Sequence, residues 1–302
     1  MKVGFIGLGT LGMPMSKTLL GAGFELIVHN RSRGKVVEMT RLGAIPAWSP
    51  AEVTEASDLV LTCLPDVPTV EQVFLGEIGI VPHCRPGQVL VDHSTIDPST
   101  ARKIAQAAQD RNAFFLDAPL GGGSPQAAVD ATLTIMVGGD RRAYEKALPV
   151  FQAMGKVIPY MGPSGAGSAM KLASNLMAGI NSVGAAEAFL LAVRLGVAPQ
   201  LFLDTASTNA GRSFMLSYLG PTMLSRDFSR TSGSLRPALR LLVKDLSLIC
   251  QIAGEVGVPL PAGTEALKVF QAAASMGMGE DDFASILLVL EELANQQSSS
   301  SP

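Results

Sequence analysis

Short, fully apolar runs alternate with amphipathic stretches through the first half of the chain. Such runs predict strands that are buried on both faces, and the stretches between them predict helices. The expected strands cover residues 2–6, 25–29, 59–64, 89–92, 114–117, 133–137 and 157–160, and the expected helices include 13–21, 98–110 and 143–154. This order is typical of an α/β fold with a mostly parallel, doubly wound sheet.

The pattern changes after Pro163, Ser164 and Gly165. From there on the apolar stripes have helical spacing, over residues 166–194, 199–207, 239–256, 261–276 and 282–294. An α/β half followed by an all-α half indicates two domains, at 1–163 and 164–294, joined by the long helix 166–194. The polar residues 295–302 are expected to form a disordered tail.

The composition narrows the class of protein. A chain of 302 residues with 47% hydrophobic residues can form two cores, which excludes an intrinsically disordered protein. The net charge of −3 gives no overall attraction to nucleic acid or to a membrane surface, so neither is expected as a partner. Cys63, Cys84 and Cys250 lie far apart, which favours reduced thiols in the cytoplasm and offers no metal-binding spacing. We therefore expect a cytoplasmic protein without a bound metal.

A long apolar segment raises the question of whether the chain crosses a membrane. Residues 165–195 are apolar over nearly the length of a membrane span. Lys171, Asn175 and Asn181 interrupt the segment, however, and such side chains are unfavourable in lipid. A buried helix of a soluble protein is the better interpretation.

A glycine-rich turn follows the first strand directly and opens the first helix, with the sequence Gly7-Leu8-Gly9-Thr10-Leu11-Gly12. The first glycine permits a tight turn, the second lets the backbone approach a pyrophosphate, and the third lets the helix pack on the strand. Free N–H groups at the start of the helix would bind the phosphates. We expect residues 7–12 to bind a dinucleotide; the alternative is a purely structural turn.

The end of the second strand distinguishes between dinucleotides. An acidic residue there would accept hydrogen bonds from the ribose of NAD, but this chain has Asn30-Arg31-Ser32-Arg33. Guanidinium and hydroxyl groups suit a phosphate. We therefore expect Asn30, Arg31 and Ser32 to bind NADP, with NAD less favoured. The alternative is that the arginines are only solvated loop cations.

Lys171 is the second chemical signal. No charged residue lies within four turns of it in its own helix, which is unusual for a lysine. An apolar environment destabilises the ammonium group, which makes it a usable proton donor and acceptor near neutral pH. Asn175 lies one turn further on the same face and could hold the substrate oxygen. A buried structural lysine is the alternative.

Two further segments follow predicted strands. Ser94 supplies a hydroxyl after the strand 89–92 and is expected to bind substrate. After the strand 114–117, the amides of Gly121, Gly122 and Gly123 could bind a substrate carboxylate. Either segment could equally be a simple turn.

Other polar residues near these segments are assigned structural roles. We interpret Asp92 and Asp117 as structural caps, and we expect His93 not to be a catalytic base. Lys244 opens a late helix, where it could reach the cofactor or form a surface ion pair.

These segments resemble the β-hydroxyacid dehydrogenase family, which includes 3-hydroxyisobutyrate dehydrogenases, tartronate semialdehyde reductases and glyoxylate/succinic semialdehyde reductases. The matching motifs are FIGLGTLGMPM, DHSTIDP, FLDAPLGGG with TLTIMVGGD, GAGSAMKLASN and LLVKDL, and they span residues 1 to about 294. The resemblance implies an N-terminal Rossmann domain and a helical C-terminal domain through which homodimers or homotetramers form.

The same resemblance implies roles for particular residues. Lys171 matches the family's catalytic lysine, and Asn175 its substrate-positioning asparagine. Further cofactor contacts are implied at Leu64, Pro65, Val70, Thr95 and Lys244.

The chain departs from the family on the side that binds the acid. Leu120-Gly121-Gly122-Gly123 replaces the usual Val-Ser-Gly-Gly, so a hydroxyl that normally touches the carboxylate is absent. The following loop, 124–131, is one residue longer and ends in alanine instead of glycine. The segment 228–244 is also longer and carries Arg230, Arg236 and Arg240. These changes concern the choice of acid more than the chemistry.

We therefore expect an oxidoreductase that transfers a hydride between NADP(H) and a small 3-hydroxy acid or aldehyde-acid, of the 3-hydroxyisobutyrate or tartronate semialdehyde type. Lys171 would act as general acid and base. An imine reductase of similar architecture is an alternative, although such proteins usually replace the lysine. A catalytically idle NADP-binding or scaffold protein is the alternative from another class.

Overall fold

The computed structural model describes residues 1–121, 124–229 and 238–299. The chain divides into two compact units, Met1–Leu172 and Ala173–Pro302. The division falls inside helix α9 (Ala166–Arg194), later than the boundary expected at residue 163. The first turns of α9 belong to the first unit because they pack tightly against its strands, as described below.

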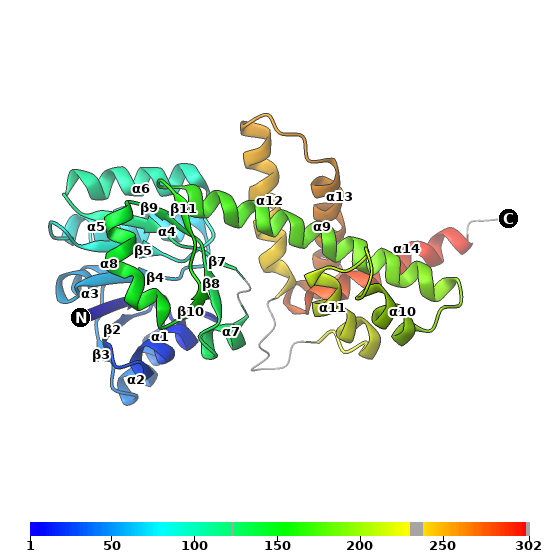
Figure 1. Cartoon of the computed structure of the whole chain (residues 1–302), viewed down its shortest axis with the longest axis horizontal. Coiled ribbons are helices and arrows are strands. Elements are labelled where there is room, and N and C mark those ends of the chain that lie inside the picture. The colour runs from blue at the N-terminus through cyan, green and yellow to red at the C-terminus, as the bar shows by residue number, and fades with distance from the viewer. Residues whose placement is uncertain (122–123, 230–237, 300–302) are drawn as a thin grey trace. The chain divides into compact units, whose positions relative to one another are not determined.

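A twisted sheet forms the centre of the first unit (Figure 1). It has eight strands, in the order β11-β9-β6-β5-β4-β1-β2-β3. Neighbouring strands are parallel except for the antiparallel pair β6 and β9. The predicted Rossmann-like, mostly parallel sheet is thus confirmed. The strands are β1 (Lys2–Ile6), β2 (Glu25–His29), β3 (Ile45–Pro46), β4 (Leu59–Thr62), β5 (Val89–Asp92), β6 (Phe114–Asp117), β9 (Val137–Gly139) and β11 (Tyr160–Gly162).

Two predicted strands are each divided between two sheets. The run 133–137 contains β8 (Leu133–Ile135) and the first residue of β9, and Met136 between them donates its amide to the Pro119 carbonyl at 3.0 Å. The run 157–160 likewise lies across β10 (Gly155–Val157) and β11. β8 and β10 form a small sheet with β7 (Leu120–Gly121). The prediction of single strands was wrong because a continuous apolar run does not show where the chain leaves one sheet for another.

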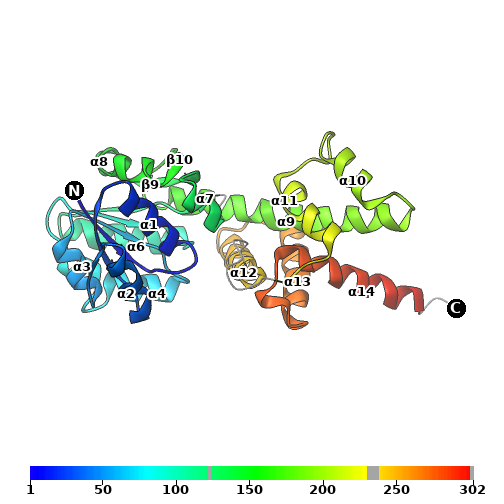
Figure 2. The same cartoon turned by 90° about the horizontal axis from the view of Figure 1, so that it is seen from below.

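Helices cover both faces of the large sheet (Figures 1 and 2). Adjacent strand residues point to opposite faces, so Leu61 and Leu116 enter one core while Val60 and Phe115 enter the other. The helices are α1 (Gly12–Gly21), α2 (Arg33–Arg41), α3 (Pro50–Ala56), α4 (Val67–Leu75), α5 (Ile80–His83), α6 (Pro98–Asp110), α7 (Pro125–Val129) and α8 (Arg141–Gln152).

Helices also make up the described part of the second unit, as predicted. They are α10 (Pro199–Ala206), α11 (Phe214–Ser225), α12 (Leu239–Glu255), α13 (Pro261–Ser275) and α14 (Ile286–Ser299), with short 3-10 helices at Met278–Glu280 and Phe283–Ser285. The sequence did not predict α11, because Gly220 and Pro221 interrupt its helical pattern. α14 continues to Ser299, so residues 295–299 are helical where a disordered tail was expected. Gln296 donates to Glu292 at 3.2 Å, one turn back, which supports this extension.

α9 is long and apolar enough to cross a membrane, judged by length and composition among the described residues. A core helix of a soluble protein can have the same properties, so they do not by themselves place α9 in a membrane. The expected burial is only partial, since 33% of its most apolar window is buried within the chain. Leu191 and Leu195, at the end of α9, are 61% and 75% exposed.

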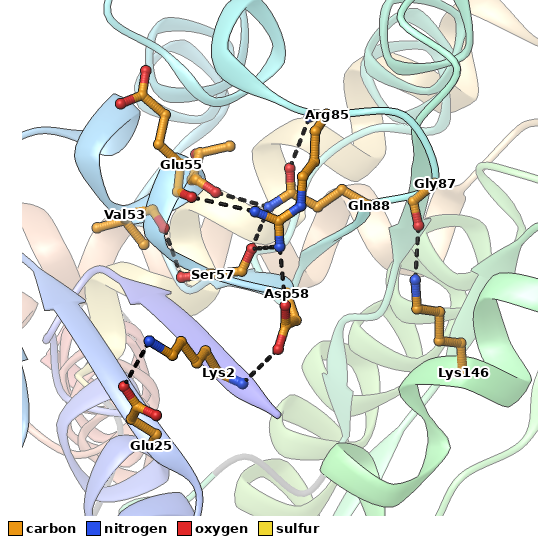
Figure 3. A network of polar contacts seen from close by, with 11 residues as sticks. Lys2, Glu25, Val53, Glu55, Ser57, Asp58, Arg85, Gly87, Gln88 and Lys146 are labelled. Carbon is orange, nitrogen blue, oxygen red and sulfur yellow. Dashed lines mark hydrogen bonds and ion pairs between the residues drawn. The ribbon is translucent and has the colours of Figure 1, made fainter.

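A polar network closes the amino edge of the large sheet (Figure 3). Gln88 is 2% exposed, and its Nε2 donates to the carbonyls of Thr54 at 2.8 Å and Ser57 at 2.9 Å. Arg85 donates to the same Ser57 carbonyl at 2.7 Å and to Asp58 at 2.9 Å. These bonds fix the end of α3 to the turn before β5.

Replacing Gln88 with leucine should therefore destabilise the first unit. Gln88→Leu keeps a similar volume but leaves the buried Thr54 carbonyl with only the long bond from the Ser57 amide, at 3.4 Å, which costs about 1–3 kcal/mol. The measurement is the free energy of unfolding in urea. As a control, Lys146→Ala removes one exposed hydrogen bond to Gly87 and should change stability by less than about 1 kcal/mol. Equal losses in the two variants would contradict this assignment.

Candidate functional site

The glycine-rich turn joins β1 to α1 in a conformation that other residues could not adopt. Gly7 has a φ of +100°, and a Cβ there would lie 2.3 Å from the Cys63 carbonyl oxygen. A Cβ on Gly12 would lie 1.9 Å from the Gly7 carbonyl oxygen. At Gly9, by contrast, no atom lies within 4 Å of a Cβ position. The turn is thus closed toward the strand and open at Gly9, where a ligand could approach.

The start of α1 can hold an anion beside this opening. Gly9 and Thr10 are exposed, and Leu11 at the N-cap position provides no side-chain cap. The first turn of α1 contains no acidic residue. The free amides and the positive end of the helix dipole therefore suit the diphosphate of a dinucleotide.

Asn30 couples the glycine-rich turn to the end of β2. Its Oδ1 accepts the Leu8 amide at 2.9 Å, and its Nδ2 donates to the Ser32 carbonyl at 3.2 Å. Leu8 itself is fully buried. The structure thus gives Asn30 and Leu8 internal partners, so both shape the turn with these groups.

Two cations lie at the end of β2. Arg31 and Arg33 are exposed, and neither forms an ion pair with an acid in the described part of the chain. Ser32, between them, does not cap α2 with its hydroxyl. The arrangement offers guanidinium and hydroxyl donors to a phosphate.

A buried carboxylate organises the ends of β4 and β5. Asp92 Oδ1 accepts from the hydroxyls of Thr62 and Ser94, both at 2.6 Å. The Ser94 hydroxyl in turn accepts the Leu64 amide at 2.8 Å. Oδ2 of Asp92 has no hydrogen-bond partner among the described residues. Burial raises the pKa of Asp92 to about 6, against the hydrogen bonds from Ser94 and Thr62 that lower it.

Two residues predicted to contact a ligand, Ser94 and Val70, have internal environments in this region. Ser94 is 3% exposed, and its hydroxyl donates to Asp92 and accepts the Leu64 amide, so it positions the backbone of Leu64. Val70, expected to line the cofactor, is 0% exposed in the core beneath α4. Of the remaining predicted contacts in this region, Pro65 is exposed, and Leu64 and Thr95 are half-buried.

His93 has a structural environment. Its Nδ1 lies 2.7 Å from the Ala118 carbonyl, and its ring packs edge-on against Phe151. Burial lowers the pKa of His93 to about 4, so the ring is neutral near pH 7. The ring is thus buried, neutral and packed within the first unit, and its role in catalysis stays a prediction.

Asp117 holds the start of α9 against the sheet. Its two carboxylate oxygens accept the amides of Gly165 at 2.8 Å and Ser168 at 2.7 Å, and the residue is 0% exposed. A Cβ on Gly167 would lie 2.3 Å from the Met136 carbonyl oxygen, so only glycine allows this approach. Lys171 lies one turn after Gly167, on the same side of α9, and is half-buried.

Asn175, one turn beyond Lys171, has a partner that sequence analysis missed. Its Nδ2 donates to Asp245 Oδ2 at 2.6 Å, and Asp245 is only 8% exposed. Lys244 Nζ lies 3.2 Å from the other carboxylate oxygen of Asp245. The sequence signal that could have indicated this partner is Asp245 itself, an acid on the apolar face of the amphipathic helix α12. Asp245 thus orients the Asn175 amide.

The segments that were predicted to bind the substrate acid are described only in part. Gly121 lies in β7, beside Thr134 of β8, whereas Gly122 and Gly123 lie outside the described residues. Ala131, at the end of the following loop, has a φ of +52°, a conformation that normally favours glycine.

Of the three arginines in the segment 228–244, the structure describes only one. Arg240 forms an ion pair with Glu280, while Arg230 and Arg236 lie outside the described residues. No group of three or more described His, Cys, Asp or Glu side chains is arranged to hold a metal ion.

A glycine-rich turn at the first strand of a Rossmann-like sheet, with a lysine at the start of the long helix, defines a dinucleotide-dependent oxidoreductase. Residues 2–162 match the model of the NAD binding domain of 6-phosphogluconate dehydrogenase, and residues 165–290 match the model of the NAD-binding region of NADP-dependent 3-hydroxyisobutyrate dehydrogenase. The chain belongs to the β-hydroxyacid dehydrogenase family.

Individual relatives agree with this assignment. The chain is 35% identical to the 2-(hydroxymethyl)glutarate dehydrogenase of Eubacterium barkeri, over 97% of this chain and 95% of that one. It is 34% identical to the NAD-dependent L-serine dehydrogenase of Pseudomonas aeruginosa, over 98% and 99%. The solved 3-hydroxyisobutyrate dehydrogenase of Mycobacterium tuberculosis with L-serine has a TM-score of 0.86 at 29% identity, over 96% and 98%. These similarities indicate an NAD(P)-dependent hydroxyacid dehydrogenase.

Asp92 and His93 have opposite effects on stability in acid. The pKa of Asp92 is raised to about 6, so its ionisation destabilises the folded state as the pH rises from about 4 to about 6. The pKa of His93 is lowered to about 4, so its protonation favours the unfolded state as the pH falls from about 6.5 to about 4. In the wild type the two effects oppose each other.

Asp92→Asn should therefore make the protein more sensitive to acid. The amide keeps an oxygen to accept from Thr62 and Ser94 but cannot ionise, so the effect of His93 is no longer opposed. Between pH 7 and pH 4 the variant should lose about 3 kcal/mol more unfolding free energy than the wild type, measured in urea at each pH. As a control, His93→Gln should lose less than the wild type. Parallel profiles for Asp92→Asn and the wild type would contradict the raised pKa.

Proposed function

We propose that this protein is an NADP-dependent reductase of a small aldehyde-acid, reversible as the dehydrogenation of a 3-hydroxy acid of the 3-hydroxyisobutyrate or tartronate semialdehyde type. The observation that carries the proposal is the attachment of α9 to the sheet through Asp117 and Gly167, with Lys171 one turn further on the same side. This attachment fixes the backbone from which the Lys171 side chain projects, near the carboxyl edge of the sheet.

The chain's own residues would hold the substrate oxygen and exchange a proton with it. NADPH, when bound, supplies the hydride. Lys171 would donate a proton to the oxygen as negative charge develops on it, and would accept that proton in the reverse direction. Asn175 would hold the same oxygen, with its amide oriented by the bond to Asp245. An oriented amide acts without reorganisation at the moment of reaction.

The amides around Gly121, Gly122 and Gly123 are proposed to hold the substrate carboxylate, together with Arg230 or Arg236. Arg240 is left out because it is paired with Glu280. Without the serine hydroxyl usual in the family, the site would rely on backbone donors at Gly121. This favours a substrate whose carboxylate approaches the backbone closely.

NADP is the proposed cofactor, although a relative named above is NAD-dependent. Support comes from Arg31, Ser32 and Arg33, since the end of β2 carries two guanidinium groups without an acidic partner among the described residues, where an NAD enzyme would have an acid. The contacts of Gly7, Gly9, Thr10, Leu11 and Gly12 with the diphosphate, and those of Leu64, Pro65, Thr95 and Lys244 with the rest of the cofactor, are part of the proposal.

We also propose a cytoplasmic homodimer or homotetramer that forms through the helical unit. Leu191, Leu195, Leu201 and Phe214 of this unit are between 59% and 75% exposed, which is unusual for large apolar side chains unless a partner covers them. Cys63, Cys84 and Cys250 form no disulfide with one another, which is the usual state of thiols in a reducing compartment.

Two alternatives make different predictions. An imine reductase would reduce cyclic imines in preference to aldehyde-acids, and Lys171 disfavours this activity. An idle binding module would bind NADPH but oxidise it with neither class of compound. Rates of NADPH oxidation with glyoxylate, succinic semialdehyde, tartronate semialdehyde, methylmalonate semialdehyde and cyclic imines distinguish the three possibilities.

Lys171→Ala should abolish most turnover without weakening cofactor binding. Loss of the proton donor should lower kcat by about 100-fold to 10,000-fold, because general acid catalysis contributes on this scale. NADPH affinity, measured by calorimetry, should change by less than about twofold. Lys268→Ala, which removes an exposed lysine of α13, is the matched control and should leave both quantities unchanged. An active Lys171→Ala variant would overturn the mechanism.

Asp117→Asn should displace Lys171 and slow the reaction. An asparagine can accept only one of the two amides, and its own NH₂ group would face the other donor. We expect kcat to fall by about 10-fold to 100-fold, since small displacements of a catalytic group have effects of this size. NADPH affinity should stay within about twofold. Asp140→Asn makes the same change at the N-cap of α8 and should affect stability alone; an equal effect on kcat would refute the positioning role.

A further inference from the structure

Trp48 is the only tryptophan in the chain, and it is 49% exposed. It follows β3, which pairs with β2 in the register Val28 to Pro46. The Ala47 amide donates to the Val28 carbonyl at 2.9 Å, so the pairing continues one step beyond the strand. Trp48 therefore lies beside the carboxyl end of β2, level with Asn30.

The backbone of Trp48 is held firmly for a surface residue. Its amide donates to Glu52 Oε2 at 2.8 Å. The Glu52 amide donates to the Ser49 hydroxyl at 3.1 Å, which caps α3. This reciprocal arrangement resembles a capping box and fixes the position from which the indole projects.

The indole contacts one of the arginines at the end of β2. The guanidinium carbon of Arg33 lies 5.4 Å from the centroid of the Trp48 ring. A guanidinium stacked on an aromatic ring uses its face, and its N–H donors point outward in the plane of the group. Stacking therefore orients Arg33 while leaving its donors available for the oxygens of an anion.

We propose that Trp48 is a specificity-determining residue that holds Arg33 toward the 2′-phosphate of NADP. The proposal rests on the proposed NADP preference and adds to it a residue just after β3 that lies outside the glycine-rich motif. The ribose of the adenosine half is expected at the carboxyl end of β2 in this fold, which is where Arg31 and Arg33 lie without acidic partners among the described residues. The Asn30 amide has internal partners, because its Oδ1 accepts the Leu8 amide and its Nδ2 donates to the Ser32 carbonyl, whereas Arg31 and Arg33 present charged donors at this strand end.

The test measures binding of adenosine 2′,5′-bisphosphate and adenosine 5′-monophosphate to the full-length protein, by calorimetry and without turnover. These two probes differ only in the 2′-phosphate. In the wild type, the bisphosphate should also change the fluorescence of the single tryptophan. Trp48→Leu removes the aromatic face, and Trp48→Phe retains one. Arg142 stacks on Phe114 at the same 5.4 Å elsewhere in the first unit, so Phe114→Leu is the matched control.

Trp48→Leu should weaken binding of the bisphosphate about fivefold, the size expected for an exposed cation–π contact, and should leave the monophosphate within about twofold. Trp48→Phe should recover most of the loss, and Phe114→Leu should bind both probes like the wild type. If the wild type prefers the bisphosphate and Trp48→Leu keeps that preference, the role of Trp48 is refuted while the NADP proposal stands. If the wild type binds both probes equally, the NADP preference itself is refuted, and the role of Trp48 with it.

Discussion

The contact between the first turn of α9 and the ends of β6 and β9 is the constraint on which the proposed chemistry of this chain depends. At Gly167 the helix backbone approaches the Met136 carbonyl so closely that a single methyl group could not fit between them. Such an approach leaves no room for side chains, so the position of α9 is set by backbone atoms. Asp117 adds hydrogen bonds to two amides of the same turn. Lys171, one turn later, therefore projects from a backbone that is held in place.

Asp92 and Asp117 show how two similar carboxylates can serve different purposes. They are paired in register on β5 and β6, and burial raises the pKa of both. Asp117 uses both oxygens to hold a helix. Asp92 uses one oxygen to arrange two hydroxyls and leaves the other without a described partner, so its charge is poorly compensated. The first arrangement supplies rigidity, and the second orients the loop at Leu64 and makes the domain responsive to pH.

Much of this architecture could be predicted because apolar strands and the glycine-rich turn are local signals. The bounds of β1, β2, β5, β6 and α6 were predicted from the residues alone. Properties that depend on distant partners could not be predicted in this way. Val70 is buried by residues from other segments of the chain. The Ser94 hydroxyl accepts the Leu64 amide, and Asn175 donates to Asp245, so both bonds connect residues far apart in sequence. A family resemblance assigns a role to a position but does not show which atoms are already occupied.

The two edges of the large sheet differ in how completely their polar groups are satisfied. At the amino edge, Gln88 and Arg85 meet carbonyls and acids, and the network is closed. At the carboxyl edge, Gly9 faces open space and the guanidinium groups of Arg31 and Arg33 have no acidic partner among the described residues. These exposed groups are hydrated when no ligand is bound, and a ligand that binds them in the folded state adds to its stability. The closed edge can thus be understood as the part of the sheet that maintains the fold while the open edge remains available for a cofactor.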